Sequence, residues 1–340
     1  MNYVSKLFLI FCYLFSFGDF SCQKLFKINY QGSPGFINPK GKVLDFPKSQ
    51  SFGEFHEGLS KFKKNNLYGF IDSTGRVIIP PKYERATNFH ENFAAVRLEG
   101  KWCYIDSDNN VVLKVDCNYA YEFSDGMAMV QQGLYYGYIN LEGHFVIPPI
   151  YEKAHSFSEG LASVKKNGKW GVIDKKNEVK IPFKYTLIGQ FSEGRCNFQT
   201  SNDSGSKWGY FNLNCKIIIP PTFDKCYPFS EGRAIFREGA FKGGNYGYID
   251  SIGNQVIPAI YDGAMSFSNG LASVARGLGK ESNYGFIDQS GKIVLNFIFS
   301  RAKSFKNELA FVRIGDYKTG VEGYINKKGK FIWKKNKSKL

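Results

Sequence analysis

The sequence has few of the residues and motifs that mark catalytic centres. Its four histidines in 340 residues lie at scattered positions, so their spacing indicates neither a metal site nor a catalytic triad. It contains no P-loop, no Gly-x-Ser-x-Gly motif and no zinc-type cysteine spacing. These absences favour a protein that is not an enzyme, and they predict neither a cofactor nor a bound metal.

Long apolar runs are also rare, because only the first residues form one. A positively charged start leads into the apolar residues 7–18, a run too short to cross a bilayer and typical of a secretory signal. We expect residues 1–22 to be a signal peptide, cleaved after Gly18 or just before Cys22. The mature protein is then exported to the periplasm, the outer surface or the medium. It is membrane-bound only if Cys22 is lipidated.

The rest of the chain is rich in aromatic residues and glycine. It contains 32 Phe, 21 Tyr and 36 Gly, and 17% of all residues are aromatic. Short runs of Val, Ile, Tyr and Phe are separated by Gly and Pro at close intervals. This composition predicts an all-β chain with a packed core.

One glycine recurs at a fixed spacing along the chain. The intervals are 34 residues from position 35 to 171 and 38 residues from 171 to 323. The positions are Gly35, Gly69, Gly137, Gly171, Gly209, Gly247, Gly285 and Gly323, with Cys103 in the same register. Residues 23–335 therefore form an array of nine units, followed by a basic tail at residues 336–340. Such periods are typical of solenoids, propellers and stacked arrays.

Each unit contains three candidate strands. In one unit, residues 161–164 and 170–173 flank an Asn-Gly turn, a strong hairpin signal. The third candidate is a β-branched run such as residues 77–81, and its closing proline pair predicts that the strand stops there. We expect nine three-stranded meanders in an open, twisted, solenoid-like stack, with a closed β-propeller as the alternative. The segments between units are expected to be loops anchored by aromatic rings.

Several of these motifs resemble those of the WG-repeat family, also called KWG repeats. The resemblance rests on Lys169-Trp170-Gly171-Val172-Ile173-Asp174, on Lys207-Trp208-Gly209-Tyr210, on Ile-Pro-Pro-x-Tyr tails and on Phe-Ser-Glu-Gly-Leu-Ala heads. It extends from about Leu25 to Trp333. It implies an exported or surface-associated bacterial array, and it brings no catalytic residues with it.

The recurring carboxylates are expected to shape turns. One set opens a four-residue turn closed by Gly or Asn, and a second set precedes turn glycines. The first set is Asp72, Asp106, Asp174, Asp250 and Asp288, and the second is Glu57, Glu159, Glu193 and Glu231.

Two cysteines depart from the pattern within one unit. Cys103 replaces the recurring glycine, and Cys117 replaces an aromatic residue such as Tyr151. If the glycine makes room for that ring, the two positions touch, and in an oxidising compartment they could form a disulfide. Two small buried thiols are an equally good interpretation.

The net charge of +15 raises the question of an anionic partner. Much of the excess lies in lysine-rich turns, which are typically solvated, and export argues against nucleic acid. The four extra residues of the 38-residue units fall between the first and second candidate strands, and equivalent insertions project from one rim of a repeat array. We expect this long-loop rim to be the binding face, with Lys207, Arg237, Lys242, Arg276, Lys280, Arg313 and Lys318.

These features favour a non-enzymatic scaffold that binds an unknown protein or surface polymer at the cell envelope or outside the cell. A carbohydrate-binding module is the second hypothesis, which exposed Trp or Tyr pairs would favour. A hydrolase is the third, and it would need two carboxylates about 5 to 10 Å apart in a cleft.

Overall fold

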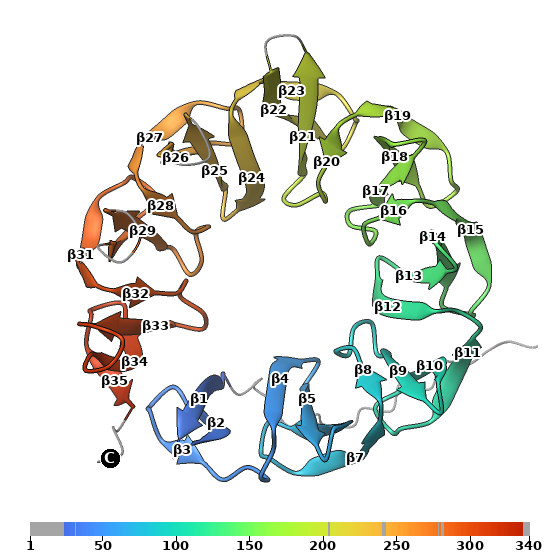
Figure 1. The fold of residues 1–340 in the computed structure, drawn as a ribbon, viewed down its shortest axis with the longest axis horizontal. Helices are drawn as coiled ribbons and strands as arrows, with labels where there is room; N and C mark the ends of the chain where they lie inside the picture. Colours follow the sequence, from blue (N-terminus) through green and yellow to red (C-terminus); the bar gives the residue numbers. More distant parts are fainter. Residues whose placement is uncertain are drawn as a thin grey trace, which may run out of the picture.

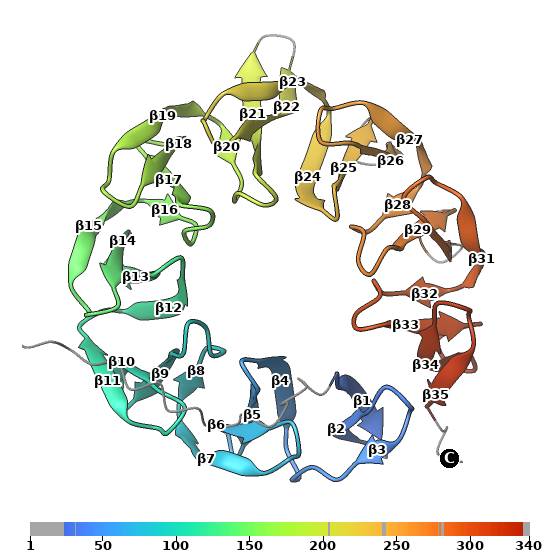
Figure 2. The ribbon, with the colours of Figure 1, turned by 180° about the vertical axis from the view of Figure 1, so that it is seen from behind.

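The described residues form nine separate antiparallel sheets arranged in a ring (Figure 1). A computed structural model describes residues 24–30, 32–202, 205–239, 243–277, 279 and 282–335. One sheet has three strands and eight have four within these residues. We number these blades 1 to 9 in chain order, and Figure 2 shows the same succession from behind. Within the described part of the chain, no helix is long and apolar enough to span a bilayer.

The strands of each blade are named here by their order from the centre of the ring outward. The inner strands are β4(Ser51–His56), β8(Arg85–Ala86), β12(Tyr119–Ser124), β16(Lys153–Ala154), β20(Leu187–Ile188), β24(Lys225–Ser230), β28(Gly263–Ala264) and β32(Arg301–Ala302). The second strands are β1(Phe26–Tyr30), β5(Leu59–Lys64), β9(Ala94–Leu98), β13(Met127–Gln132), β17(Leu161–Lys166), β21(Arg195–Asn202), β25(Arg233–Glu238), β29(Ala272–Arg276) and β33(Leu309–Ile314). The third strands are β2(Ser33–Ile37), β6(Leu67–Asp72), β10(Lys101–Ile105), β14(Tyr135–Asn140), β18(Lys169–Asp174), β22(Gly205–Asn212), β26(Asn245–Ile249), β30(Asn283–Ile287) and β34(Val321–Asn326). The outer strands are β3(Val43–Leu44), β7(Val77–Tyr83), β11(Val111–Val115), β15(Phe145–Tyr151), β19(Val179–Tyr185), β23(Ile217–Phe223), β27(Gln255–Tyr261), β31(Ile293–Phe299) and β35(Phe331–Lys334).

The predicted open stack is wrong, because the array closes into a nine-bladed β-propeller. Blade 1 packs against blade 9, where Phe26 and Ile28 share a buried cluster with Leu309 and Trp333. The Tyr324 hydroxyl donates a hydrogen bond to the Lys27 carbonyl across this contact, at 2.8 Å. The all-β class and the nine units are confirmed, and the closed alternative is the observed form.

The predicted three-stranded unit is also incomplete. The segment between units, expected to be a loop, contributes an inner strand to each of blades 2 to 9. In blade 4 this strand is six residues long and pairs Ala120 with Val130. In blade 5 it is two residues long, because only Lys153 and Ala154 stay in register with the second strand. Strands this short leave no alternating pattern that a sequence could reveal.

The proline pairs do not end the third candidate strand. Strand β7 continues through Pro80 and Pro81 and pairs Tyr83 with Tyr68. Between this pair and the pair of Phe70 with Ile79, β7 has two more residues than β6, which makes a bulge. Proline is tolerated at such a bulge because the strand is the outer edge of its blade.

The recurring glycine is required by this bulge. A Cβ atom placed on Gly137 would lie 2.6 Å from the Ile147 carbonyl oxygen and 2.7 Å from the Pro149 nitrogen. The glycine therefore makes room for the backbone of the outer strand and not for an aromatic ring. Gly35 in blade 1 is the exception, because its outer strand has no such bulge and the nearest atom to an added Cβ is 3.8 Å away.

The hydrophobic core is divided among the contacts between blades. One cluster joins Tyr138 and Ile147 of blade 4 to Phe157, Val164 and Ile173 of blade 5, all almost fully buried. Each blade therefore buries its apolar faces against its neighbours, as expected of a repeat array.

The two glycines provide a matched pair of substitutions. We expect Gly137→Ala to lower the free energy of unfolding by roughly 1 to 3 kcal/mol, since the bulge backbone must move. We expect Gly35→Ala to have little effect, since its methyl group has space. Urea denaturation of both variants measures the difference, and equal losses would contradict the role assigned to the bulge.

Candidate functional site

The Phe-Ser-Glu-Gly segments form the turns between inner and second strands, called here the inner-rim turns. In blade 5, the Ser158 N–H donates to the Leu161 carbonyl at 3.0 Å and closes the turn. Glu159 and Gly160 both have positive φ, at 56° and 83°. Such a backbone favours glycine at the second position and is tolerated by glutamate at the first only because surrounding contacts hold it.

The acidic side chains of the inner-rim turns in blades 2 to 7 bind the backbone of the next turn around the ring. The Glu159 carboxylate accepts a hydrogen bond from the Gly194 N–H at 3.0 Å. The equivalent bonds are 2.5 to 3.0 Å long. They join Glu57 to Asn92, Glu91 to Gly126, Asp125 to Gly160, Glu159 to Gly194, Glu193 to Gly232, Glu231 to Gly270, and, through an amide oxygen, Asn269 to Glu308.

The serine of the same turn makes a second bond to the next blade. The Ser158 hydroxyl donates to the Phe191 carbonyl at 3.0 Å, and the Ser192 hydroxyl donates to the Phe229 carbonyl at 3.1 Å. Phe191 is itself buried, at 3% exposure. The prediction that these glutamates are structural is confirmed, and their partner is the neighbouring blade.

The aspartates that open the other turns also accept hydrogen bonds from the backbone. Asp174 Oδ1 accepts hydrogen bonds from the backbone N–H groups of Lys176 and Glu178, both at 2.9 Å. The side-chain bond from Asn110 lowers the pKa of Asp106. These aspartates are half-buried residues whose carboxylates are held by the backbone of their own turns.

Two of the four histidines meet at the inner rim. The rings of His56 in blade 2 and His90 in blade 3 are 4.9 Å apart, and His90 Nε2 is 3.5 Å from a Glu122 carboxylate oxygen. Burial, and then the neighbouring His90, lowers the pKa of His56. Among the described residues, no three His, Cys, Asp or Glu side chains are placed to hold a metal ion.

Two of the cations predicted for the long-loop rim form ion pairs with nearby carboxylates. The Lys207 ammonium lies 2.6 Å from Asp224 Oδ1, and Arg313 forms an ion pair with Glu322. The hairpin of β21 and β22 that carries Lys207 projects beyond the outline of the ring (Figure 1).

The remaining rim residues are also spread over separate blades. Arg276 lies over the Phe297 ring, 4.4 Å from its centroid, and Arg237 is buried at 8% exposure. The Lys318 N–H donates to Asp316 within a local turn. Outside the described residues lie Lys242 and Lys280. The long-loop rim therefore stays a prediction, since its described cations lie on separate blades and contact groups in their own surroundings.

Cys103 and Cys117 are free thiols in this structure. Blade 3 lacks the proline bulge, so Cys103 faces Lys114 and Trp102 faces Val115 in a regular ladder. A side chain at position 103 therefore fits where a glycine is needed elsewhere. Burial raises the pKa of Cys117 to about 11, which favours the protonated thiol.

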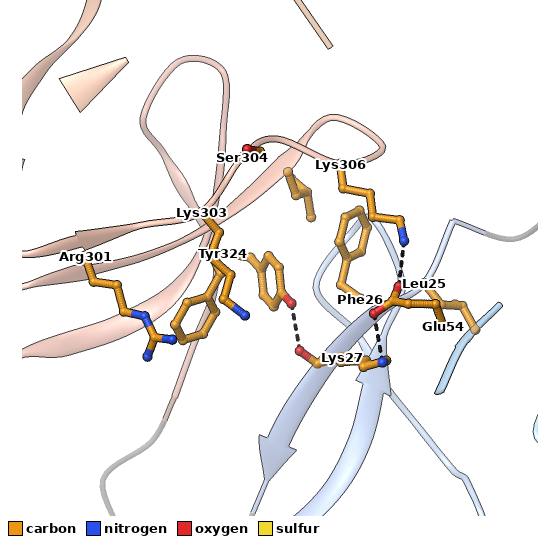
Figure 3. A pocket seen from close by; sticks show the side chains of 11 residues that line it. Leu25, Phe26, Lys27, Glu54, Arg301, Lys303, Ser304, Lys306 and Tyr324 are labelled. Carbon is orange, nitrogen blue, oxygen red and sulfur yellow. Dashed lines mark hydrogen bonds and ion pairs between the residues drawn. The ribbon is translucent and has the colours of Figure 1, made fainter. Parts of the chain in front are cut away.

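A cavity of about 410 Å³ lies where blade 9 meets blade 1, and we call it the closure pocket (Figure 3). Three aromatic residues, four cations and one carboxylate are among the residues that line it. It is lined by Leu25, Phe26, Lys27, Glu54, Arg301, Lys303, Ser304, Lys306, Leu309, Phe311 and Tyr324.

Glu54 connects three blades at this pocket. Its carboxylate lies 2.8 Å from the Lys27 ammonium of blade 1 and 2.6 Å from the Lys306 ammonium of blade 9. Burial alone would raise the pKa of Glu54, but the hydrogen bonds from the two lysines hold it below its usual value. With one carboxylate among four cations, the pocket suits an anionic ligand.

Sequence reasoning missed these residues. Their contact joins positions 252 residues apart, which no local pattern indicates. One signal was present: Lys306 takes the place that Ser158, Ser192 and Ser230 hold in other units.

Comparison with known proteins identifies the repeat. Eight stretches match the family model described as "WG containing repeat", at residues 35–68, 68–102, 104–133, 136–170, 170–202, 208–240, 246–277 and 284–317. No curated protein sequence matches the chain.

Solved structures resemble the chain in fold. A structure titled "Crystal structure of the eukaryotic initiation factor" is 11% identical, covers 92% of this chain and 96% of its own, and gives a TM-score of 0.63. Dipeptidyl peptidase 4 of Porphyromonas gingivalis is 9% identical, with 90% and 63% coverage and a TM-score of 0.50. At such identities the likeness concerns the propeller fold alone.

The inner-rim bonds predict that two glutamates contribute differently to the free energy of unfolding. Glu159→Ala is expected to lower the free energy of unfolding by on the order of 1 kcal/mol, because the Gly194 N–H loses its charged acceptor. Glu142→Ala, at an exposed turn position, serves as the control and should change little. Denaturant unfolding measures both, and amide exchange at Gly194 reports the bond directly. Equal stability of the two variants would contradict the inner-rim role.

Proposed function

The chain belongs to the WG-repeat family, and on that premise we propose that it is an exported, non-enzymatic scaffold that binds a protein or a polymer. The repeat propeller fold suggests a scaffold or binding role, since such rings present surfaces built from many blades. The proposal places the protein in the cell envelope or outside the cell, because of the apolar residues 7–18. Residues 1–23, including Cys22, lie outside the described structure.

The main support for the proposal is that the recurring polar residues form hydrogen bonds that hold turns and blades together. The inner-rim carboxylates bind the backbone of the next blade, and the turn aspartates bind their own turns. Neither set is left with an exposed pair of carboxylates in a cleft, which a hydrolase would need. The likeness to a peptidase at 9% identity does not alter this, because it extends to the fold only.

The closure pocket supports binding more than any of the predicted loop residues do. Lys27, Arg301, Lys303 and Lys306 surround it, and Phe26, Phe311 and Tyr324 supply apolar surface. A site of this kind combines charge attraction with buried aromatic contacts, which carry much of the affinity of protein interfaces. We expect an acidic partner there, with no role for nucleic acid in an exported protein.

The carbohydrate-binding hypothesis gains no support from the tryptophans. Trp102, Trp170, Trp208 and Trp333 are all between 3% and 8% exposed. Rings buried in this way offer no platform on which a sugar could stack. Tyr135 and Tyr317 are exposed, but they belong to blades 4 and 9.

Site-specific photo-crosslinking in the exporting cell tests the proposal. A photoreactive amino acid is placed at Ser304 in the closure pocket, at Lys318 in the long-loop rim, or at the exposed Lys176 as a control. We expect discrete adducts with one partner from Ser304, and none from Lys176. Adducts from Lys318 alone would move the binding face to the long-loop rim. Identical adducts from all three positions, or none from Ser304 and Lys318, would overturn the proposal.

A further inference from the structure

A second cavity, of about 440 Å³, lies between blades 8 and 9, and we call it the 8–9 pocket. Figure 1 shows β28 and β32 as the inner strands of these two neighbouring blades. Blade 8 contributes Gly263, Met265, Ser273 and Tyr284 to the lining, and blade 9 contributes the segment 300–303. A cavity of this size matches small-molecule sites, which are usually about 300 to 1,000 Å³.

Blade 8 carries small or unbranched side chains where blade 7 carries longer or aromatic ones. Gly263 lines the pocket at a position that holds Lys225 in blade 7. Met265 takes the place of Tyr227, since each lies two residues further along the chain. In blade 7 the Tyr227 ring lies 6.4 Å from the Tyr246 ring. Blade 8 has no ring in this place, which leaves room for the pocket.

The Ser273 hydroxyl is buried in the wall of this pocket without a hydrogen-bond partner. Ser273 is 1% exposed, and its Oγ has no donor or acceptor among the described residues. Ser163 has the same position in blade 5, where its hydroxyl donates to the Gly189 carbonyl of blade 6 at 2.5 Å. A buried hydroxyl without such a partner costs free energy, so a ligand that supplies one is favoured at this position.

A backbone carbonyl at the same contact also lacks a donor. At the contact between blades 7 and 8, the Tyr248 hydroxyl donates to the Met265 carbonyl at 2.8 Å. The corresponding residues of blades 8 and 9 are Phe286, which has no hydroxyl, and Lys303. Within the part of the chain that the structure describes, no group donates to the Lys303 carbonyl.

The ring of Tyr284 is the third group without its usual partner. In other blades the aromatic residue before the recurring glycine contacts another ring or a cation. The Trp170 ring lies 5.0 Å from the His155 ring. The Lys225 ammonium lies 3.8 Å from the centroid of the Trp208 ring. Tyr284 is half-buried and has no such ring or cation contact with the described side chains.

The cations beside the pocket are engaged with other groups. Arg301 and Lys303 lie over the Phe311 ring, 6.0 and 5.9 Å from its centroid. Arg313 forms an ion pair with Glu322. The described residues that line the pocket include no carboxylate. Since its open groups are hydroxyls and a carbonyl, the pocket suits a neutral ligand that both donates and accepts hydrogen bonds.

We propose that the 8–9 pocket binds a neutral sugar, with one face of the sugar ring against Tyr284. Sugar hydroxyls donate and accept, so one bonds to Ser273 Oγ and another donates to the Lys303 carbonyl. The C–H face of the sugar packs on the tyrosine ring, which provides the platform that the buried tryptophans do not. The inference goes beyond the proposed function, because this pocket lies apart from the closure pocket and takes a different class of ligand.

Saturation-transfer difference NMR with the mature protein tests for the sugar. The uncharged probes are glucose, galactose, N-acetylglucosamine, cellobiose and N,N′-diacetylchitobiose. We expect at least one of them to receive saturation, with the largest effect at the C–H groups of one ring face, because that face packs against Tyr284. If none of the probes binds, water alone fills the pocket and the inference is overturned.

Substitutions at two positions locate the binding. Ser273→Ile introduces the residue that blade 7 buries at this position, Ile235, and should weaken binding at least about tenfold by filling the pocket. Tyr284→Ala removes the stacking surface and should weaken binding to a similar extent. Tyr246→Ala, at the same position in blade 7, is the matched control and should leave binding unchanged. Binding that survives both pocket substitutions would place the sugar elsewhere and overturn the inference.

The thermal stability of two serine variants tests whether the Ser273 hydroxyl lacks a partner. Ser163→Ala removes the hydrogen bond to Gly189 and should lower Tm. Ser273→Ala removes a hydroxyl that has no partner and should leave Tm unchanged or raise it. Both variants are measured without sugar. An equal loss of Tm would show that Ser273 is hydrogen-bonded in the free protein and would overturn the inference.

This inference and the proposed function can fail separately. Sugar binding without crosslinked partners from Ser304 or Lys318 would support this inference, although the closure pocket would then have no partner. Crosslinked partners at Ser304 without binding of any probe sugar would refute this inference alone. If circular dichroism shows that Ser273→Ile does not fold, Tyr284→Ala and its control decide the location.

Discussion

The interaction on which the ring depends is the hydrogen bond between the acidic side chain of one inner-rim turn and a backbone N–H of the next. The turn places its residues at positive φ, as at Glu159 and Gly160, and leaves N–H groups without partners inside their own blade. The preceding blade satisfies them, and a serine adds a second bond. The bond is unaffected by hairpin length, because the longer loops lie between the second and third strands. The 34- and 38-residue units therefore belong to one ring.

Much of the local structure could be predicted from the sequence. The hairpin of residues 161–173, the turn opened by Asp72 and the nine units were all expected and observed. The inner strands were not predicted: a two-residue strand such as β16 has no periodicity, and a longer one such as β12 is interrupted by a bulge. The bulge at Pro80 and Pro81 was missed because proline normally ends a strand. Closure could not be predicted either, since it follows from small rotations summed over nine blades and from no local pattern.

The candidate site was even harder to predict from the sequence than the fold was. Lys306 reaches Glu54 only because the ends of the array meet, so the sequence around either residue carries no sign of the contact. The predicted long-loop cations were chosen from loop length, and Lys207 and Arg313 turn out to have carboxylate partners nearby. The repeat motif indicates the fold, but it does not indicate the site, which lies where the first and last blades meet.

Zero-length carbodiimide cross-linking of the monomer, followed by peptide mass spectrometry, tests the closed ring most directly. The reagent joins a carboxylate to an amine only in direct contact, and Glu54 lies 2.6 Å from Lys306. Mixing isotopically labelled and unlabelled protein distinguishes links within one chain from links between chains. The account predicts an intramolecular link between residues 54 and 306, together with one between residues 54 and 27. Recovery of the 54–27 link without the 54–306 link would contradict closure, because those residues would then lie at opposite ends of an open array.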